Sequence, residues 1–156
     1  MGSSILGGES VLDVGGYFQR TYTGLQSHNI VYLQVTFYII DNWSRNREGI
    51  ELYVDGVKFV LWLDVAQEVD WGSNLCGSGF YNDMGKITMR AKILHSSPTI
   101  TLKFVHSLPS GSGSMSWGIR DLSLVTNMNS GSEVNEVCGY AHTETLWTKV
   151  CDCPDG

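Results

Sequence analysis

The segment that most constrains the fold runs from residue 28 to residue 63, where apolar residues recur at every second position. In its first part Gln34 and Thr36 share one face of an extended strand with further apolar residues, so we expect both faces to be at least partly covered. The opposite face carries an unbroken apolar series: Val31, Leu33, Val35, Phe37 and Ile39.

A second alternating segment follows a polar loop and contains the pair Asp55-Gly56. Asp-Gly between two alternating segments is a strong β-hairpin signal, because the turn requires positive φ at its centre. The apolar phase before the pair is predicted to resume after it, and the series is Ile50, Leu52, Val54, Val57, Phe59, Leu61 and Leu63. These segments predict an antiparallel β-domain whose loops carry the function.

Four further segments have the character of strands, near residues 11–14, 17–23, 87–93 and 100–104, and a weak final one lies near 145–150. No segment of useful length has the period of a helix. The sequence therefore predicts an all-β fold, a two-sheet antiparallel jelly-roll sandwich of about eight to ten strands.

The 156 residues fit one domain. We expect a flexible segment over residues 1–10, the sandwich over 11–150, and a tail at 151–156 that begins a Cys-rich continuation.

The segment SWGIRDLSLV contains a phase change. Trp117 and Ile119 share one parity, whereas Leu122 and Leu124 have the other. A β-bulge near Arg120-Asp121 produces such a change and would aim a charged side chain inward or toward a site. An edge strand with imperfect alternation is the competing interpretation.

The charge of the chain excludes some classes of partner. A net charge of −6, with no basic patch or Arg-rich segment, argues against nucleic acid and against an anionic membrane surface. No apolar segment approaches the roughly 18 residues that a membrane helix needs.

The cysteines favour an oxidising compartment. Cys76, Cys138, Cys151 and Cys153 permit two disulfides in any of three pairings. Zinc is the alternative, although the usual ligand spacing is absent. The triplet Asn42-Trp43-Ser44 is a glycosylation acceptor sequence, so Asn42 is a predicted glycan site, and the setting is expected to be extracellular or the cell surface.

The loop DNWSRNREG concentrates oxygen donors, which suit calcium. Asp41 and Glu48 are its predicted ligands, with Asp121 and Asp13 as further candidates. The alternatives are a solvated loop that carries a glycan and, for Asp121, a salt bridge with Arg120 or Arg90.

Aromatic residues provide the candidate ligand site. Trp62 and Trp117 fall on predicted strands and are assigned to the core. Trp43, Trp71 and Tyr81 lie in predicted loops, where a ring beside Asn42 suits stacking on a sugar.

Catalysis has little support in the sequence. The four histidines are scattered, and no nucleophile elbow, phosphate loop or Cys-centred motif is present. His28 and His106 lie at strand ends, where a hydrogen-bonded structural role is expected. We expect no enzyme activity.

The segments HNIVYLQVTFYIIDNW, ELYVDG, the pair Cys76-Gly77, ITLKFVHSL and SWGIRDLSLV resemble a domain of ciliate cell-surface proteins. Those domains are galactose-binding-like jelly rolls that precede Cys-rich, furin-like or EGF-like repeats, and the ending CDCPDG is similar to that junction. The resemblance implies a non-catalytic extracellular module, with Asp121 near a structural calcium.

Two functions are therefore expected. The first is extracellular recognition or adhesion, with binding of a glycan or a cell-surface protein. The second is a structural subunit of a filament or coat, in which the N-terminal segment with Ile5, Val11 and Val14 adds a strand to a neighbouring copy.

Overall fold

The computed structural model describes residues 5–8, 11–12, 15–41, 49–63, 85–106, 115–128 and 136–140. These residues form nine β-strands and no helix, which confirms the predicted all-β class. Within them there is accordingly no helix that could cross a membrane. The strands are β1 (Leu6–Gly7), β2 (Tyr17–Thr23), β3 (Ile30–Ile40), β4 (Gly49–Val54), β5 (Val57–Leu63), β6 (Gly85–Leu94), β7 (Thr99–His106), β8 (Ser116–Asn127) and β9 (Glu136–Tyr140).

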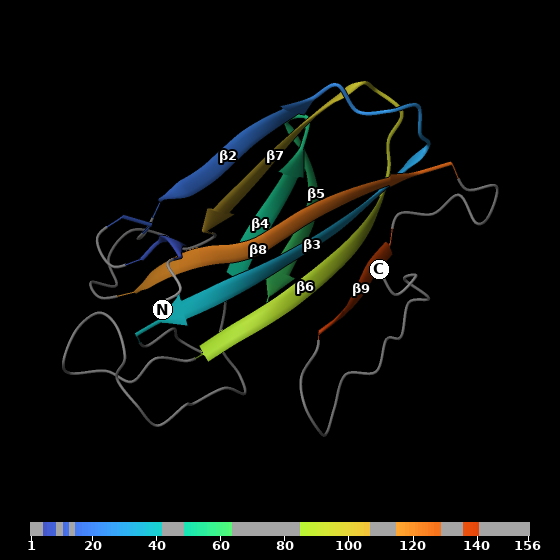
Figure 1. The fold of residues 1–156 in the computed structure, drawn as a ribbon. Coiled ribbons are helices and arrows are strands. Elements are labelled where there is room, and N and C mark those ends of the chain that lie inside the picture. Colours follow the sequence, from blue (N-terminus) through green and yellow to red (C-terminus); the bar gives the residue numbers. More distant parts are fainter. Residues whose placement is uncertain are drawn as a thin grey trace, which may run out of the picture.

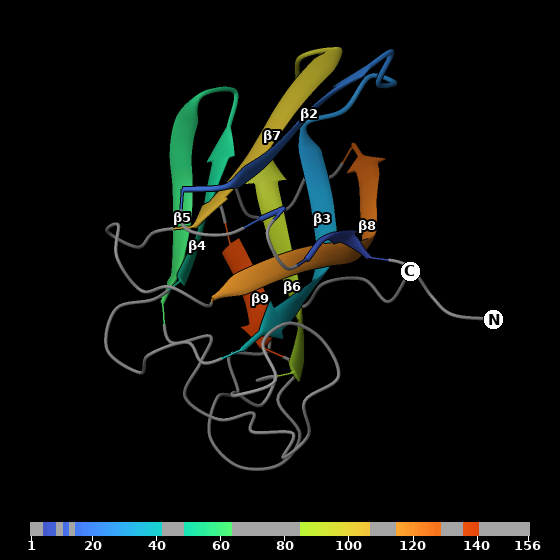
Figure 2. The ribbon, with the colours of Figure 1, turned by 90° about the vertical axis from the view of Figure 1, so that its left-hand side faces the viewer.

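The strands form two antiparallel sheets that pack face to face (Figures 1 and 2). One has five strands in the order β1-β8-β3-β6-β9, and the other has four in the order β2-β7-β4-β5. Apart from the β4–β5 hairpin, each step along the chain from β1 to β8 crosses to the other sheet. This is the double Greek-key arrangement of a jelly-roll sandwich, as the sequence predicts.

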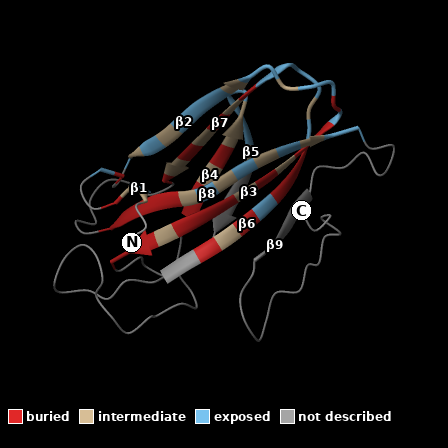
Figure 3. Cartoon of the chain, in the orientation of Figure 1, coloured by how far each residue is buried: buried red, intermediate tan, exposed pale blue. Residues whose placement is uncertain are grey.

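The core lies between the two sheets and is built from the alternating apolar positions (Figure 3). The predicted inner face of β3 is buried along its whole length. The alternating apolar residues of β6 and β7 are buried as well: Ile87, Met89, Ala91, Ile93, Ile100, Leu102 and Phe104. Phe37 packs edge-on against Phe104, with ring centroids 5.5 Å apart, and also contacts Trp117, so these three rings join the sheets at the centre.

The β4–β5 hairpin has the predicted two-residue turn. Asp55 and Gly56 both have positive φ, 50° and 81°, as an Asp-Gly hairpin turn requires. The predicted unbroken alternation after the turn is wrong, because Phe59 is an extra residue in β5. This bulge makes Val60 and Trp62, rather than Leu61 and Leu63, the register partners of the buried Leu52 and Ile50.

The predicted bulge in β8 is confirmed. Between Arg120 and Ser123 two residues of β8 stand opposite Val35 of β3, and Asp121 adopts a φ of 54°. The extra residue resolves the change of parity, since Trp117 and Ile119 before it and Leu122 and Leu124 after it all pack on the core. The expectation of an inward charge is wrong for Asp121: its side chain is 59% exposed and lies 3.4 Å from Arg120.

The first strand is not where the sequence places it. The expected strand at Val11–Val14 is wrong, because Val11 and Leu12 lie in a turn; residues 13 and 14 are outside the described part. The strand is formed by Leu6–Gly7, inside the segment expected to be flexible, and it pairs with Ile119 and Gly118 of β8. The backbone N–H of Gly8 then donates to the carbonyl oxygen of Trp117 (2.8 Å).

At the other end of the chain, β9 lies beside β6 and was not expected from the sequence. The weak strand expected at residues 145–150 falls outside the described residues.

Candidate functional site

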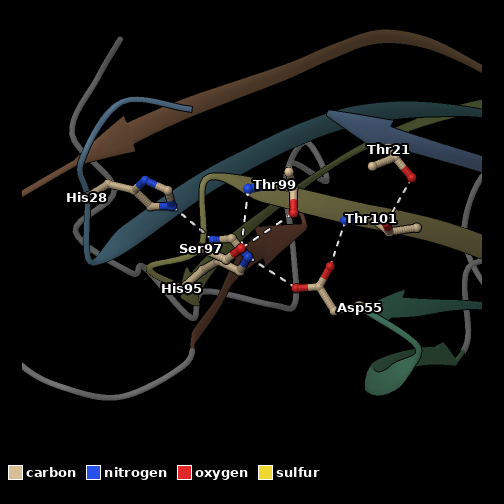
Figure 4. Close-up of polar contacts among 7 residues, drawn as sticks. All are labelled: Thr21, His28, Asp55, His95, Ser97, Thr99 and Thr101. Atoms are coloured by element: carbon tan, nitrogen blue, oxygen red, sulfur yellow. Dashed lines mark hydrogen bonds and ion pairs between the residues drawn. The ribbon is translucent and has the colours of Figure 1, made fainter. Parts of the chain in front are cut away.

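Three ionisable side chains from distant parts of the sequence meet at one end of the sandwich (Figure 4). His28 lies two residues before the start of β3, and His95 follows β6 in the same sheet. Asp55 comes from the β4–β5 turn of the opposite sheet. The group, which we call the His-His-Asp relay, therefore bridges the two layers.

Short hydrogen bonds run through the relay in a single line. Nδ1 of His28 lies 2.6 Å from the carbonyl oxygen of Gln26, and Nε2 lies 2.9 Å from Nδ1 of His95. Nε2 of His95 lies 3.1 Å from Oδ2 of Asp55, and Oδ1 accepts a hydrogen bond from the backbone N–H of Thr101 (2.7 Å). The two imidazole rings are nearly parallel, since their planes differ by 14°, and their centroids lie 5.2 Å apart.

The relay is largely removed from solvent at its histidines. His28 is 4% exposed and the His95 side chain 7%, whereas the Asp55 side chain is 45% exposed. Every ring nitrogen already has a partner within the protein, so neither imidazole is positioned to take a proton from a bound molecule. The relay therefore has the geometry of a structural link rather than that of a catalytic base.

A second feature is the outer face of the four-stranded sheet. Because side chains alternate across a strand, the residues between the buried core positions of β2, β4 and β7 point away from the core. We call this surface, together with Lys58 of β5, the polar face. Its members are Tyr17, Gln19, Thr21, Glu51, Tyr53, Lys58, Thr99, Thr101, Lys103 and Val105.

The register arranges the polar face in rows across the strands. Gln19, Lys103 and Tyr53 form one row, which Lys58 extends as the register partner of Tyr53. Tyr17 lies one row away, 56% exposed, and the Lys103 ammonium lies 4.5 Å from the centre of its ring. From strand and residue spacings, Tyr17 and Tyr53 are about 12 Å apart.

Glu51 organises the middle of the polar face. Its two carboxylate oxygens accept hydrogen bonds from Nζ of Lys58 (2.6 Å) and from the Tyr53 hydroxyl (2.7 Å). The hydrogen bond from Lys58, followed by that from Tyr53, lowers the pKa of Glu51 below its usual value of 4.5. The same hydrogen bonds to Glu51 raise the pKa values of Tyr53 and Lys58.

The outer face of the five-stranded sheet is covered in part. Thr36 and Lys92 on this side are only 5% and 9% exposed, and Tyr32 and Tyr38 are half-buried. Among the described residues, this cover is confined to part of that surface, since Arg90 of β6 and Ser123 and Val125 of β8 are exposed.

Most residues that the sequence nominates for a ligand fall outside the described part of the chain. This holds for the predicted sugar-binding residues Asn42, Trp43, Trp71 and Tyr81, and for Glu48. The same is true of Asp13, Cys76, Cys151 and Cys153, while the backbone of Cys138 lies in β9.

Two predicted calcium ligands are described, and the structure does not bring them together. Asp41 follows β3 directly, is 1% exposed and has a φ of 61°. Asp121 lies opposite Val35, six residues back along β3, which corresponds to about 20 Å. The two carboxylates cannot bind one calcium ion, whose ligands lie about 2.3–2.6 Å away. No group of three or more candidate His, Cys, Asp or Glu metal ligands occurs within the described ranges.

Sequence analysis missed both the relay and the polar face. The expected structural, hydrogen-bonded role of His28 is confirmed, but its partner His95 is 67 residues away. The sequence held one indication of the relay, which is that His28, Asp55 and His95 each lie at a strand end or in a turn. Only the strand order shows that these strand ends lie together.

Comparison with known proteins adds nothing to this picture, since no family model, curated protein or solved structure matches the chain.

Proposed function

We propose that this jelly-roll domain is a non-catalytic extracellular recognition module that binds carbohydrate across the polar face. The observation that carries the proposal is the row Gln19, Lys103, Tyr53 and Lys58, flanked by the exposed ring of Tyr17. The extracellular setting rests on the even number of cysteines and on the acceptor sequence at Asn42.

The chemistry of the polar face favours a sugar over other ligands. Its hydroxyl, amide, ammonium and carboxylate groups match the hydrogen-bonding groups of a carbohydrate, and phenol rings offer apolar faces for stacking. An apolar protein helix would leave these polar groups without partners. The net charge of −6 disfavours nucleic acid.

The rigidity of the polar face supports the same proposal. Lys103 is held against Tyr17, and Glu51 fixes both Tyr53 and Lys58. Side chains that are already ordered lose less conformational entropy on binding, which favours recognition of a weakly bound polar ligand. Trp43, Trp71 and Tyr81, which lie outside the described residues, remain ligand residues proposed from the sequence alone, and calcium remains a proposed stabilising ion through Asp41.

The test is a glycan array with the whole chain, run once with calcium and once with chelator. Binding is expected to fall at least tenfold in Tyr17→Ala and Lys103→Met. Tyr32→Ala, a tyrosine of the opposite sheet surface, is the matched control and should bind as the unmodified protein does. Absence of binding in both conditions, or equal loss in all three variants, would refute the proposal.

A second candidate, a structural subunit that assembles by strand addition, has one observation in its favour. β8 has 12 residues, and within the described part of the chain β1 pairs with two of them, through Leu6 and Gly7. The same segment of a second copy would join two molecules if it paired there instead. Filaments or chains of particles in electron micrographs of purified protein would favour this candidate, and isolated particles would count against it.

A further inference from the structure

We propose that the His-His-Asp relay is a proton-dependent clasp between the two sheets, which holds one more proton than two neutral histidines carry. The argument starts from the acceptor at one end. The carbonyl oxygen of Gln26 can only accept, so Nδ1 of His28 must carry a proton. The carboxylate of Asp55 at the other end also accepts, so Nε2 of His95 must carry one.

One proton also has to lie between the two rings. The 2.9 Å contact from Nε2 of His28 to Nδ1 of His95 is a hydrogen bond only if one of these nitrogens is protonated. The line from Gln26 to Asp55 therefore holds three protons, whereas two neutral imidazoles supply two. The additional proton makes the ring pair a shared imidazolium, paired with the Asp55 carboxylate.

The surroundings make this the favourable charge state. An imidazolium beside a carboxylate is neutral overall, which suits rings that are 4% and 7% exposed. Loss of the proton between the rings would leave the lone pair of Nε2 of His28 facing that of Nδ1 of His95, and this contact would become repulsive.

Few other charges face the relay. No other ionisable side chain is present in the described parts that pack against it: residues 24–29 before β3, residues 94–101 around the β6–β7 connection, residues 126–128 at the end of β8, and the turn at 55–56. Lys58 is the nearest cation along β5, and it is paired with Glu51. Asp55 is therefore the counter-ion that decides the protonation state.

The direction of the pH dependence follows. The clasp holds three ring protons, whereas the two imidazoles of the unfolded chain together hold four at low pH and two at high pH, and pass through three at about pH 6.5. Where the folded state binds more protons, stability falls as pH rises. One extra proton lowers the folding equilibrium constant by at most about tenfold per pH unit. The contribution of the clasp to stability should therefore be largest near pH 6.5 and should fall through the mildly alkaline range.

Asp55→Asn separates this idea from a merely structural contact. An Asn amide can donate through Nδ2 to Nε2 of His95 and accept the Thr101 N–H through Oδ1, so two neutral histidines then satisfy the whole line. Asn also tolerates the φ of 50° and forms good Asn-Gly turns. The variant should fold normally and lose the relay's pH dependence.

The experiment measures urea unfolding from pH 5.5 to pH 8.5 for the unmodified chain, Asp55→Asn and Asp121→Asn. Asp121→Asn is the matched control, since it makes the same change at another exposed position with positive φ. Above pH 6.5 the folding equilibrium constant of the unmodified chain and of the control should fall by about threefold to tenfold per pH unit. The folding equilibrium constant of Asp55→Asn should fall much less. Mass spectrometry checks the variant for Asn-Gly deamidation.

A second measurement keeps the proposal testable if the variant does not fold. Imidazole ¹⁵N shifts of the unmodified protein at pH 6 report the protons on His28 and His95 directly. Three protons on the four ring nitrogens support the clasp. Two neutral rings in the folded protein, or the same pH slope in Asp55→Asn as in Asp121→Asn, would overturn it.

Discussion

Gly7 offers a sharp test of whether the N-terminal segment belongs to the sandwich. It has a φ of 107°, and a Cβ built on it would lie 2.5 Å from a methyl of Leu12 and 2.8 Å from the carbonyl oxygen of Trp117. The methyl group can move, but the carbonyl is backbone in β8 and already accepts from Gly8. Gly7→Ala must therefore displace the segment from β8.

The magnitude is obtained by comparison with Gly15. Gly15 has a φ of 80°, yet a Cβ there would meet nothing within 4 Å. Both alanine variants carry backbone strain of about 1–3 kcal/mol. Gly7→Ala additionally loses one backbone hydrogen bond and part of the burial of Leu12, which together amount to about 1–2 kcal/mol. We expect the extra loss to lower the melting temperature by about 2–8 °C relative to Gly15→Ala.

Urea unfolding of both variants, followed by tryptophan fluorescence, measures the difference in their free energies of unfolding, and thermal unfolding measures the difference in melting temperature. A change in fluorescence of the folded Gly7→Ala protein would report on Trp117. Equal destabilisation by the two substitutions would refute the reasoning, because it would mean that residues 5–12 do not dock on β8.

Two further predictions concern β8 and the polar face. Deletion of Asp121 removes the extra residue and leaves Trp117, Ile119, Leu122 and Leu124 in one unbroken alternation. We therefore expect the near-ultraviolet circular dichroism signal to be retained, as it should be in Asp121→Gly, which suits the positive φ; loss of the signal in the deletion variant would contradict the assignment of the bulge. Glu51 has a lowered pKa, chiefly through the hydrogen bond from Lys58, so its contribution is present above about pH 4.5 and is lost as the pH falls further. Glu51→Gln should therefore flatten the acid side of a stability-against-pH curve, and an unchanged acid side would contradict this assignment.

Much of the fold follows from the sequence, because alternation of apolar residues is a local property. The inner face of β3, the Asp55-Gly56 turn and the bulge in β8 could all be read from the spacing of residues along one strand. The short strand β1 could not, since two residues show no period and their pairing depends on β8, more than 100 residues later.

The bulge at Phe59 was hidden for a related reason. The residues of β5 are apolar at both parities, so the pattern alone does not show which set faces the core. Only the pairing with β4 shows the register, in which Val60 stands opposite Leu52.

The candidate sites belong to the tertiary structure. Sequence reasoning placed the ligand site in loops with exposed aromatic residues, because it treats each segment by itself. The polar face needs three strands in the order β2-β7-β4 before Gln19, Lys103 and Tyr53 form a row. The residue types of the chain thus determined its sheets and turns, whereas the meeting of His28, His95 and Asp55 was decided by the crossing of the chain between two layers, since hydrogen bonds depend on distance in space and not along the chain.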